Sequence, residues 1–327
     1  MIRRPIIIDC DPGLDDTIAL FMAIASDNFD IKGVTAVAGN QTLPKISKNA
    51  LQIVDFAGSN APVVKGADRP LIKEAVTAEH VHGETGLGDI VLPDANKSFL
   101  DKKAWDFIYE EAIKCNGELE IIAIGPLTNI AITLLKYPNI KYIISRIIIM
   151  GGSCGLGNDT PAAEFNIYAD PDAAKIVFES GVNLTMVGLD ATHKTLLYEE
   201  EIEQISKIDN KVAKVATRIF KNGLTFSLQN GFTGAVQHDP MAMAFAIDET
   251  LMKSKRYFVG VETKGEFTRG KTVVDIYNVT GKAPNAAVGA FPGTLYISTT
   301  VLPLVNSPFV STPTKYFLLF ISVSSIA

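Results

Sequence analysis

The first two thirds of the chain alternates short, β-branched apolar runs with longer segments in which apolar residues recur at helical spacing. A continuous apolar run predicts a buried strand, and apolar positions three and four residues apart predict an amphipathic helix. The predicted strands are Pro5–Asp9, Ile31–Ala38, Leu119–Ile124, Ile143–Met150 and Asn183–Leu189. The predicted helices are Asp15–Ser26, Lys45–Phe56, Asp101–Lys114, Leu127–Leu135, Asp170–Glu179, Glu199–Ile208 and Lys211–Gln229.

This order of elements is typical of βαβ units, so we expect a single α/β domain with a Rossmann-like, mainly parallel sheet flanked by helices. The stretch from Gly58 to Asn96 is rich in loop-forming residues. Near the end of the regular pattern, Arg256–Glu262 and Lys271–Tyr277 predict a hairpin. In open α/β sheets, ligands bind beyond the carboxyl ends of the strands. The site is therefore expected in the loops that follow the predicted strands.

Polar residues gather in those loops. The acidic and amide residues found there are Asp11, Asp15 and Asp16 after the first strand, Asn40 after the second, and Asn158, Glu164 and Asn166 after Ile143–Met150. Because the carboxyl ends of parallel strands meet at one edge, we expect these side chains to lie together.

The densest of these features is DCDPGLDD, residues 9–16, at a strand-to-helix turn. One interpretation is helix capping, since a carboxylate near a helix N-terminus is stabilised by about 0.3–1 kcal/mol. Capping accounts for one or two of the four carboxylates. It does not account for three that converge, because their mutual repulsion calls for a cation or a raised pKa. Oxygen ligands of this kind suit Ca²⁺ or Mg²⁺, and we therefore favour a metal site.

Composition narrows the class of function. A net charge of −6 and the lack of a dense Lys/Arg run argue against binding to a nucleic-acid backbone. Three cysteines without paired spacing favour a reduced, cytoplasmic protein. The first apolar run is interrupted by Asp9 and Asp11, which makes it too short for a signal peptide, and no run approaches the roughly 18–20 apolar residues of a membrane span. We expect a cytoplasmic protein that binds neither nucleic acid nor membrane.

The end of the sequence differs in composition from the rest. Lys315 is the only charged residue between Ala283 and Ala327, although 20% of the whole chain is charged. We therefore divide the chain into a catalytic domain over residues 1–286 and an atypical low-charge tail over residues 287–327. Our hypothesis is that the tail is a frameshift product or a locally divergent end that adds no function.

Taken together, the motifs resemble those of the inosine–uridine-preferring nucleoside hydrolases. The resemblance runs from about Ile6 to about Asn285 and rests on an ordered set: DCDPGLDD (9–16), AVAGN (36–40), HGETGLG (82–88), IGPLTNIA (124–131), MGG (150–152), EFNIYADP (164–171) and HDPMA (238–242). It implies hydrolysis of the N-glycosidic bond of ribonucleosides to free base and ribose. By analogy with the family, it also implies a homodimer or homotetramer.

The resemblance further implies one Ca²⁺ ion at the bottom of the pocket. Asp11 would also act as the base that takes a proton from the attacking water, and the transition state would resemble an oxocarbenium ion. The implied ligands are Asp11, Asp15, Asp16, the backbone carbonyl of Ile124, and Asp239.

Other matched positions surround the sugar and the base. His238 matches the general acid for the departing base; a lone histidine is more often structural, but its position next to Asp239 favours catalysis. His82 matches a residue near the base. The implied ribose-binding residues are Asn40, Asn158, Glu164 and Asn166.

The base side of the pocket is less defined. At helical spacing Asn222, Phe226 and Asn230 share one face, which offers a ring for stacking and two amides, although a partly buried helix face explains the pattern equally well. The sequence leaves purine against pyrimidine preference open. We take His193 as structural and Cys154 as incidental.

Two other functions compete with this one. A haloacid-dehalogenase-like phosphohydrolase also follows a strand with a DxD motif and Mg²⁺, but AVAGN and HDPMA supply none of its remaining residues. The second alternative is a metal-stabilised nucleoside-binding protein, or pseudoenzyme, that binds nucleosides without turnover. Ribose release that is abolished by Asp11→Ala would distinguish the hydrolase from both.

Overall fold

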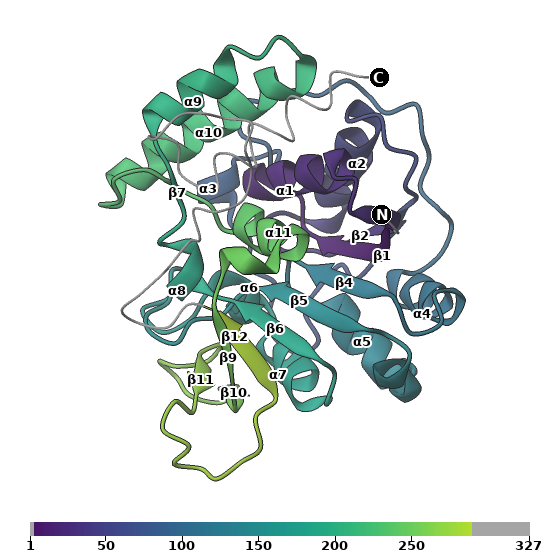
Figure 1. Ribbon diagram of the computed structural model, residues 1–327, viewed down its shortest axis with the longest axis vertical. Coiled ribbons are helices and arrows are strands. Elements are labelled where there is room, and N and C mark those ends of the chain that lie inside the picture. The colour runs from purple at the N-terminus through teal and green to yellow at the C-terminus, as the bar shows by residue number, and fades with distance from the viewer. Residues whose placement is uncertain (1–2, 290–327) are drawn as a thin grey trace.

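The computed structural model describes residues 3–289, and an eight-stranded sheet runs through it (Figure 1). Seven strands are parallel, and the last, at one edge, is antiparallel to its neighbour. Across the sheet the order is β3 (Val63–Lys65), β2 (Phe29–Ala36), β1 (Arg4–Cys10), β4 (Glu120–Ala123), β5 (Arg146–Met150), β6 (Leu184–Val187), β12 (Ala286–Gly289) and β9 (Ser254–Tyr257).

Both faces of the sheet are apolar because successive side chains of a strand point to opposite faces. In β1, Ile6 and Ile8 enter one core and Ile7 enters the other. In β5, Ile148 enters the first of these cores and Ile147 enters the second. A strand that is buried on both faces therefore reads as a continuous apolar run, which is the pattern that predicted these strands.

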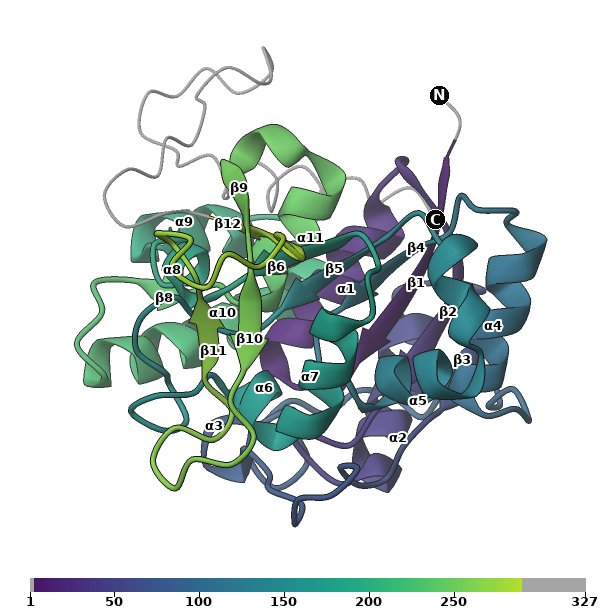
Figure 2. The ribbon, with the colours of Figure 1, turned by 90° about the horizontal axis from the view of Figure 1, so that it is seen from below.

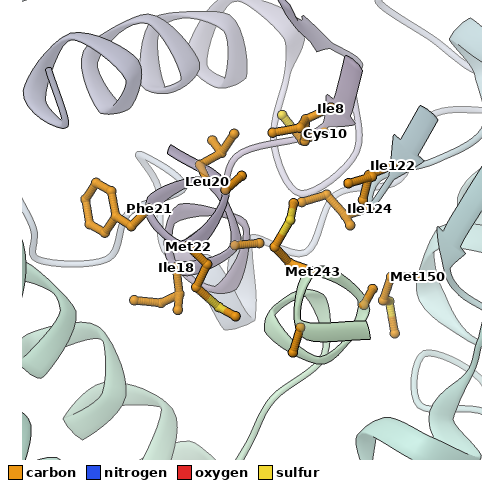
Figure 3. Packing of buried hydrophobic residues seen from close by; sticks show 14 of the residues in the cluster. Ile8, Cys10, Ile18, Leu20, Phe21, Met22, Ile122, Ile124, Met150 and Met243 are labelled. Carbon is orange, nitrogen blue, oxygen red and sulfur yellow. The ribbon is translucent and has the colours of Figure 1, made fainter. Parts of the chain in front are cut away.

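Helices close both cores. One core is closed by α1 (Leu14–Ala25), α2 (Leu43–Phe56), α9 (Glu199–Ser206), α10 (Lys211–Gln229) and α11 (Asp239–Ile247). The other is closed by α4 (Ala104–Lys114), α5 (Thr128–Lys136) and α7 (Pro171–Glu179), which lie together in Figure 2. In Figure 3, Met243 of α11 reaches between α1 and the end of β4, where Leu20 and Ile124 lie.

The strand order places a topological switch point between β1 and β4. From β1 the chain moves outward through β2 and β3, and then returns to the other side of β1 to form β4, β5 and β6. Asp9 pairs with Ala123, and the N–H of Ile124 donates a 2.8 Å hydrogen bond to the carbonyl of Asp9. Asp11 and Ile124 thus leave the sheet at the crevice where this fold class binds ligands.

Short elements frame the carboxyl edge and the ends of the sheet. They are α3 (Glu79–His82), α6 (Phe165–Ala169), α8 (Leu189–Thr192), the 3₁₀ helices η1 (Pro138–Tyr142) and η2 (Glu249–Leu251), the pair β7 (Leu196–Leu197) with β8 (Ala235–Val236), and the pair β10 (Val259–Val261) with β11 (Thr272–Val274).

The predicted fold class is confirmed, and the predicted parallel strands and helices match observed elements to within a few residues. The predicted hairpin is only partly right. Val259–Val261 and Thr272–Val274 do pair antiparallel, but Ser254–Tyr257 is a separate strand that joins the main sheet beside β12. The β conformation is interrupted at Phe258, between β9 and β10. The predicted strand Arg256–Glu262 is therefore divided between two sheets.

Several elements were not predicted: β3 and α3 lie inside the stretch Gly58–Asn96 that was expected to be rich in loops, and α11 and β12 were also missed. For α11 and β12 the reason is physical. In α11, residues 239–246 are all buried, so the helix has no polar face and no amphipathic period. In β12, the sequence AAVG has little β-branched character, and only its position between β6 and β9 makes it a strand. The proposed boundary at 286/287 falls inside β12, and the tail beyond Gly289 lies outside the described residues.

Within residues 3–289, no helix is both long enough and apolar enough to cross a membrane.

Candidate active site

A cavity of about 630 Å³ opens at the carboxyl edge of the sheet. Its floor includes Asp15, Asn40, Ile124 and Asp239, and α10 forms one wall. The residues predicted after separate strands, together with His82, His238 and Phe226, therefore line one space. Asp11 and Asp16 lie buried directly beneath it, bonded to Asn40.

Asp11 is fully buried and only half satisfied. Its Oδ2 accepts a 2.7 Å hydrogen bond from the N–H of Asn40, whereas its Oδ1 has no hydrogen-bond partner among the described residues. Two glycines make room for this carboxylate: a Cβ on Gly39 would lie 2.1 Å from Oδ2, and one on Gly125 would lie 2.5 Å from Oδ1. The chain thus encloses a buried carboxylate oxygen without giving it a protein donor.

Three further carboxylates converge beside Asp11. One oxygen from each of Asp15, Asp16 and Asp239 can be chosen so that all lie within 4.8 Å of one another. Asp16 accepts hydrogen bonds from the N–H groups of Asp11 (3.1 Å) and Gly13 (2.9 Å). Within the described part of the chain, none of these four aspartates forms an ion pair with a basic residue.

The crowding changes the acidity of these groups. Burial, and then the charge of Asp16, raise the pKa of Asp11 well above its usual range. Burial, followed by the charge of Asp15, raises the pKa of Asp16 to about 7 and that of Asp239 well above its ordinary value. Removing water and adding negative neighbours both disfavour the ionised form. A cation placed among these oxygens would reverse both effects, so the donor set fits a metal ion that prefers oxygen.

The residues assigned to the sugar are held by their own hydrogen bonds. Glu164 caps α6 and accepts from the N–H groups of Gly152 (2.9 Å) and Asn166 (2.9 Å). The side-chain amide of Asn166 donates to the carbonyl of Ile124 (2.9 Å), which lines the cavity. Asn158 is exposed on the rim and accepts from the N–H of Phe165 (3.0 Å). Burial raises the pKa of Glu164 to about 7.

The imidazoles of His82 and His238 both line the cavity. The Nδ1 of His82 accepts a 3.1 Å hydrogen bond from the N–H of Leu14, and the Nδ1 of His238 lies 2.9 Å from the hydroxyl of Thr192. Burial lowers the pKa of His82 and lowers that of His238 to about 4. Both rings are therefore neutral at pH 7, and among residues 3–289 the hydrogen bonds found for them are at Nδ1.

His193 is a residue that sequence reasoning set aside as structural, yet it lines the cavity. Its ring packs edge-on against His238 at 5.6 Å and against Phe232 at 5.0 Å. The signal was present, because His193 follows the Asn183–Leu189 run just as the other site residues follow their strands. Cys154, taken as incidental, has a pKa raised to about 12 by burial and by Asp190, so its thiol stays protonated.

The α10 wall brings Asn222, Phe226 and Asn230 to the cavity, as their spacing predicted. The two amides are partly committed: Asn222 donates to Asp89 (2.9 Å), and Asn230 donates to the carbonyl of Phe226 (2.9 Å). Phe226 remains 39% exposed at the cavity. An aromatic face is therefore available where a planar ligand would enter.

Comparison with known proteins identifies the family of this chain. The sequence profile of the family described as inosine-uridine preferring nucleoside hydrolase matches residues 6–291, and the chain belongs to that family. This covers nearly all of the described residues.

Individual relatives agree with the family assignment. The chain is 43% identical over 288 residues to the pyrimidine-specific ribonucleoside hydrolase RihA of Shewanella woodyi, and 42% identical over 287 residues to the protein of the same name from Escherichia coli strain K12. Each alignment covers 87% of this chain and 92% of the relative. Among solved structures, the purine-preferring ribonucleoside hydrolase from Gardnerella vaginalis superimposes with a TM-score of 0.88 at 32% identity, covering 99% of this chain and all of that one.

The protein is therefore an enzyme of the ribonucleoside hydrolase class, which splits ribonucleosides into base and ribose. The phosphohydrolase alternative is not supported. The family membership fixes the class of reaction, whereas the roles of single residues rest on the geometry above.

Proposed function

We propose that this enzyme hydrolyses the N-glycosidic bond of ribonucleosides with Ca²⁺ held by Asp11, Asp15, Asp16, Asp239 and the carbonyl of Ile124. The observation that carries the proposal is the buried Oδ1 of Asp11, which has no hydrogen-bond donor among residues 3–289 and lies beside three converging carboxylates. All the donors are oxygens, and Ca²⁺ takes six to eight of them, which leaves positions for water and a sugar diol. When bound, Ca²⁺ supplies the positive charge that keeps these carboxylates ionised and makes water in the site more acidic.

Asp11 is the base of this mechanism. It accepts a proton from the attacking water, whose oxygen then bonds to the anomeric carbon as the bond to the base breaks. Its Oδ1 is suited to this because no group in the described part of the chain donates a hydrogen bond to it. Positive charge builds up on the ribose ring in an oxocarbenium-like transition state.

Four polar residues bind and orient the ribose. Amides and a carboxylate can match hydroxyl groups, which both donate and accept. The negative charge of Glu164 also lies where the ring becomes positive, which stabilises the transition state over the substrate. These residues are Asn40, Asn158, Glu164 and Asn166.

His238 serves the departing base. Because its imidazole is neutral at pH 7, it offers an N–H hydrogen bond that stabilises the negative charge that develops on the departing base. His82 supplies a second N–H toward the base, and Phe226 stacks on it from α10.

Pyrimidine ribonucleosides are the substrates that we propose first. The support is the greater identity to relatives named pyrimidine-specific, at 42–43%, than to the purine-preferring enzyme, at 32%. Measuring kcat/KM for uridine, cytidine, inosine and adenosine tests this preference directly. Higher kcat/KM for inosine than for uridine would contradict it.

The test of the mechanism measures ribose release by the full chain before and after chelation. Activity should disappear with chelator, return with Ca²⁺, and be abolished by Asp11→Ala. A generic phosphate ester is the control substrate and should not react. Nucleoside binding without turnover in the presence of Ca²⁺ would instead establish the pseudoenzyme.

The proposal extends to a cytoplasmic location and a homo-oligomeric assembly. Cys10, Cys115 and Cys154 are all free thiols, which suits a reducing cytoplasm. We expect cell fractionation to place the protein there, and light scattering to give a homodimer or homotetramer.

A further inference from the structure

The last residues of α8 hold the ring of His238. Thr192 is the final residue of that helix, is fully buried, and has its Oγ1 2.9 Å from the Nδ1 of His238. The next residue, His193, packs its ring edge-on against the same imidazole. Two consecutive side chains thus contact the proposed leaving-group acid from one element.

The hydrogen on the Thr192 hydroxyl identifies the donor in this contact. Three other buried helical threonines give that hydrogen to the carbonyl four residues earlier, Thr17 at 2.6 Å and Thr133 and Thr217 at 2.7 Å. Thr192 makes no such side-chain bond within residues 3–289, and the Nδ1 of His238 is the acceptor it meets there. Because a buried hydroxyl hydrogen needs an acceptor, Thr192 donates and Nδ1 accepts.

His82 gives an independent case of the same arrangement. Its Nδ1 faces the backbone N–H of Leu14, which can only donate. His82 must therefore be the tautomer that carries its proton on Nε2. His82 and His238 agree in geometry and differ in the group that faces Nδ1: a backbone amide for His82, and for His238 a side-chain hydroxyl that mutation can remove.

The backbone fixes the distance between Thr192 and His238. The N–H of Gln237, directly before His238, donates to the carbonyl of Thr195 (3.0 Å). On the far side of that bond, β7 and β8 pair through Leu196 with Val236 and Leu197 with Ala235. The segment after α8 and the segment before α11 are thereby joined, so the hydroxyl is presented to the ring by a rigid frame.

We propose that Thr192 is a positioning residue that holds His238 as the Nε2–H tautomer, with that N–H directed at the departing base. This inference rests on the proposed function of His238. Without the hydroxyl, the ring can carry its proton on Nδ1 and present a bare Nε2, which cannot donate. Thr192 therefore acts on departure of the base and leaves binding of the sugar and metal unchanged.

Kinetics with two leaving groups test the proposal. Thr192→Val removes the hydroxyl at nearly constant volume, Thr192→Ser keeps it, and Thr133→Val is the matched control for loss of a buried helical hydroxyl. With uridine, Thr192→Val should lower kcat by roughly 10²-fold with little change in KM, because only donation to the base is lost. With 4-nitrophenyl β-D-ribofuranoside, whose leaving group departs without a proton, kcat should stay near wild type.

The serine variant and the control decide against a merely structural role. Thr192→Ser should recover most of the uridine activity, and Thr133→Val should treat both substrates alike. Equal losses of kcat on both substrates for Thr192→Val, or no loss on uridine, would overturn the proposal.

Nitrogen NMR tests the tautomer without any turnover. The chain has four histidines, so long-range ¹H–¹⁵N spectra of the full-length protein are tractable, and His238→Asn assigns the ring in question. We expect His238 to match His82, with a bare Nδ1 and a protonated Nε2, and to lose that pattern in Thr192→Val. A protonated Nδ1 in the wild type would overturn the inference. If instead no nucleoside is hydrolysed while the tautomer is as expected, the proposed function fails and the hydrogen-bond assignment stands.

Discussion

At the amino ends of the central strands Glu120 lies between two arginines, whereas at the carboxyl ends Asp11 and its neighbours have no cationic partner within the described residues. Glu120 is 6% exposed and accepts from Arg4 at 2.9 and 3.0 Å and from Arg146 at 3.1 Å. Arg146 also pairs with Glu249 at 2.6 Å. The buried carboxylate at this edge thus has two opposite charges against it.

The carboxyl edge has the reverse arrangement. Asp11, Asp16 and Asp239 are buried within one small volume, and their pKa values rise because burial and like charges act together. The protein alone does not balance this edge. A buried charge that is paired with an opposite charge is compatible with a structural role. Buried charges that have no opposite charge beside them indicate a site where a ligand supplies it.

The largest expected effect comes from neutralising one carboxylate at the carboxyl edge. Asp11→Asn keeps the shape of the side chain but removes the base and a metal ligand, so ribose release should fall by at least about 10³-fold. In chelator the variant should be as stable as wild type or more stable, because a costly buried carboxylate is gone. Retained hydrolysis, or a clear loss of stability without metal, would contradict the difference that we infer between the two edges of the sheet.

The same chemical change at the amino edge should have the opposite outcome. Glu120→Gln leaves Arg4 and Arg146 without their counter-charge and should lower the free energy of unfolding by about 3 kcal/mol. Activity per folded molecule should not change, since Glu120 lies a full strand, roughly 13 Å, from Ile124. Denaturant unfolding and ribose release at saturating uridine measure the two quantities. A large loss of kcat would show that the edges are not independent.

The pH dependence of stability should show that the carboxylates at the carboxyl edge lack an opposite charge. The folded protein holds protons on Asp16 up to a pKa of about 7, whereas the unfolded chain releases them near 3.8, so metal-free stability falls as pH rises between these values. From pH 5 to 8 we expect Tm to drop by about 5 °C or more without metal. Ca²⁺ should remove much of this pH dependence. A smaller pH dependence should remain, because the pKa values of Asp9 and Glu164 are also raised to about 7. An identical slope with and without Ca²⁺ would exclude a cation among these carboxylates.

The smallest effect is expected from an exposed ion pair near the amino edge. Arg3 and Asp27 are 2.6 Å apart, but their side chains are 58% and 86% exposed. Solvent screens such a pair, so Asp27→Asn should change the free energy of unfolding by less than about 0.5 kcal/mol. Set beside Glu120→Gln, this variant separates burial from the mere presence of an ion pair. A loss as large as that of Glu120→Gln would contradict the explanation.

The sequence alone determined the fold class and most elements, because strands buried on both faces and amphipathic helices have periods that can be read directly. It also brought Asp11, Asn40 and Glu164 to one edge, since parallel strands place their carboxyl ends together. Among the elements it did not reveal, α11 and β12 show why. One is apolar on every side, and the other is a strand only because of its neighbours.

Only the tertiary structure decided the hydrogen bonds and charges of the site. That Oδ1 of Asp11 lacks a donor, that Thr192 faces His238, and that His193 belongs to the cavity wall each depend on residues far apart in the chain. Periodicity describes which face of an element is buried, but not which group meets another across a cavity. The sequence thus supplied the carboxylates, and packing them against one another without a counter-charge is what makes them a site.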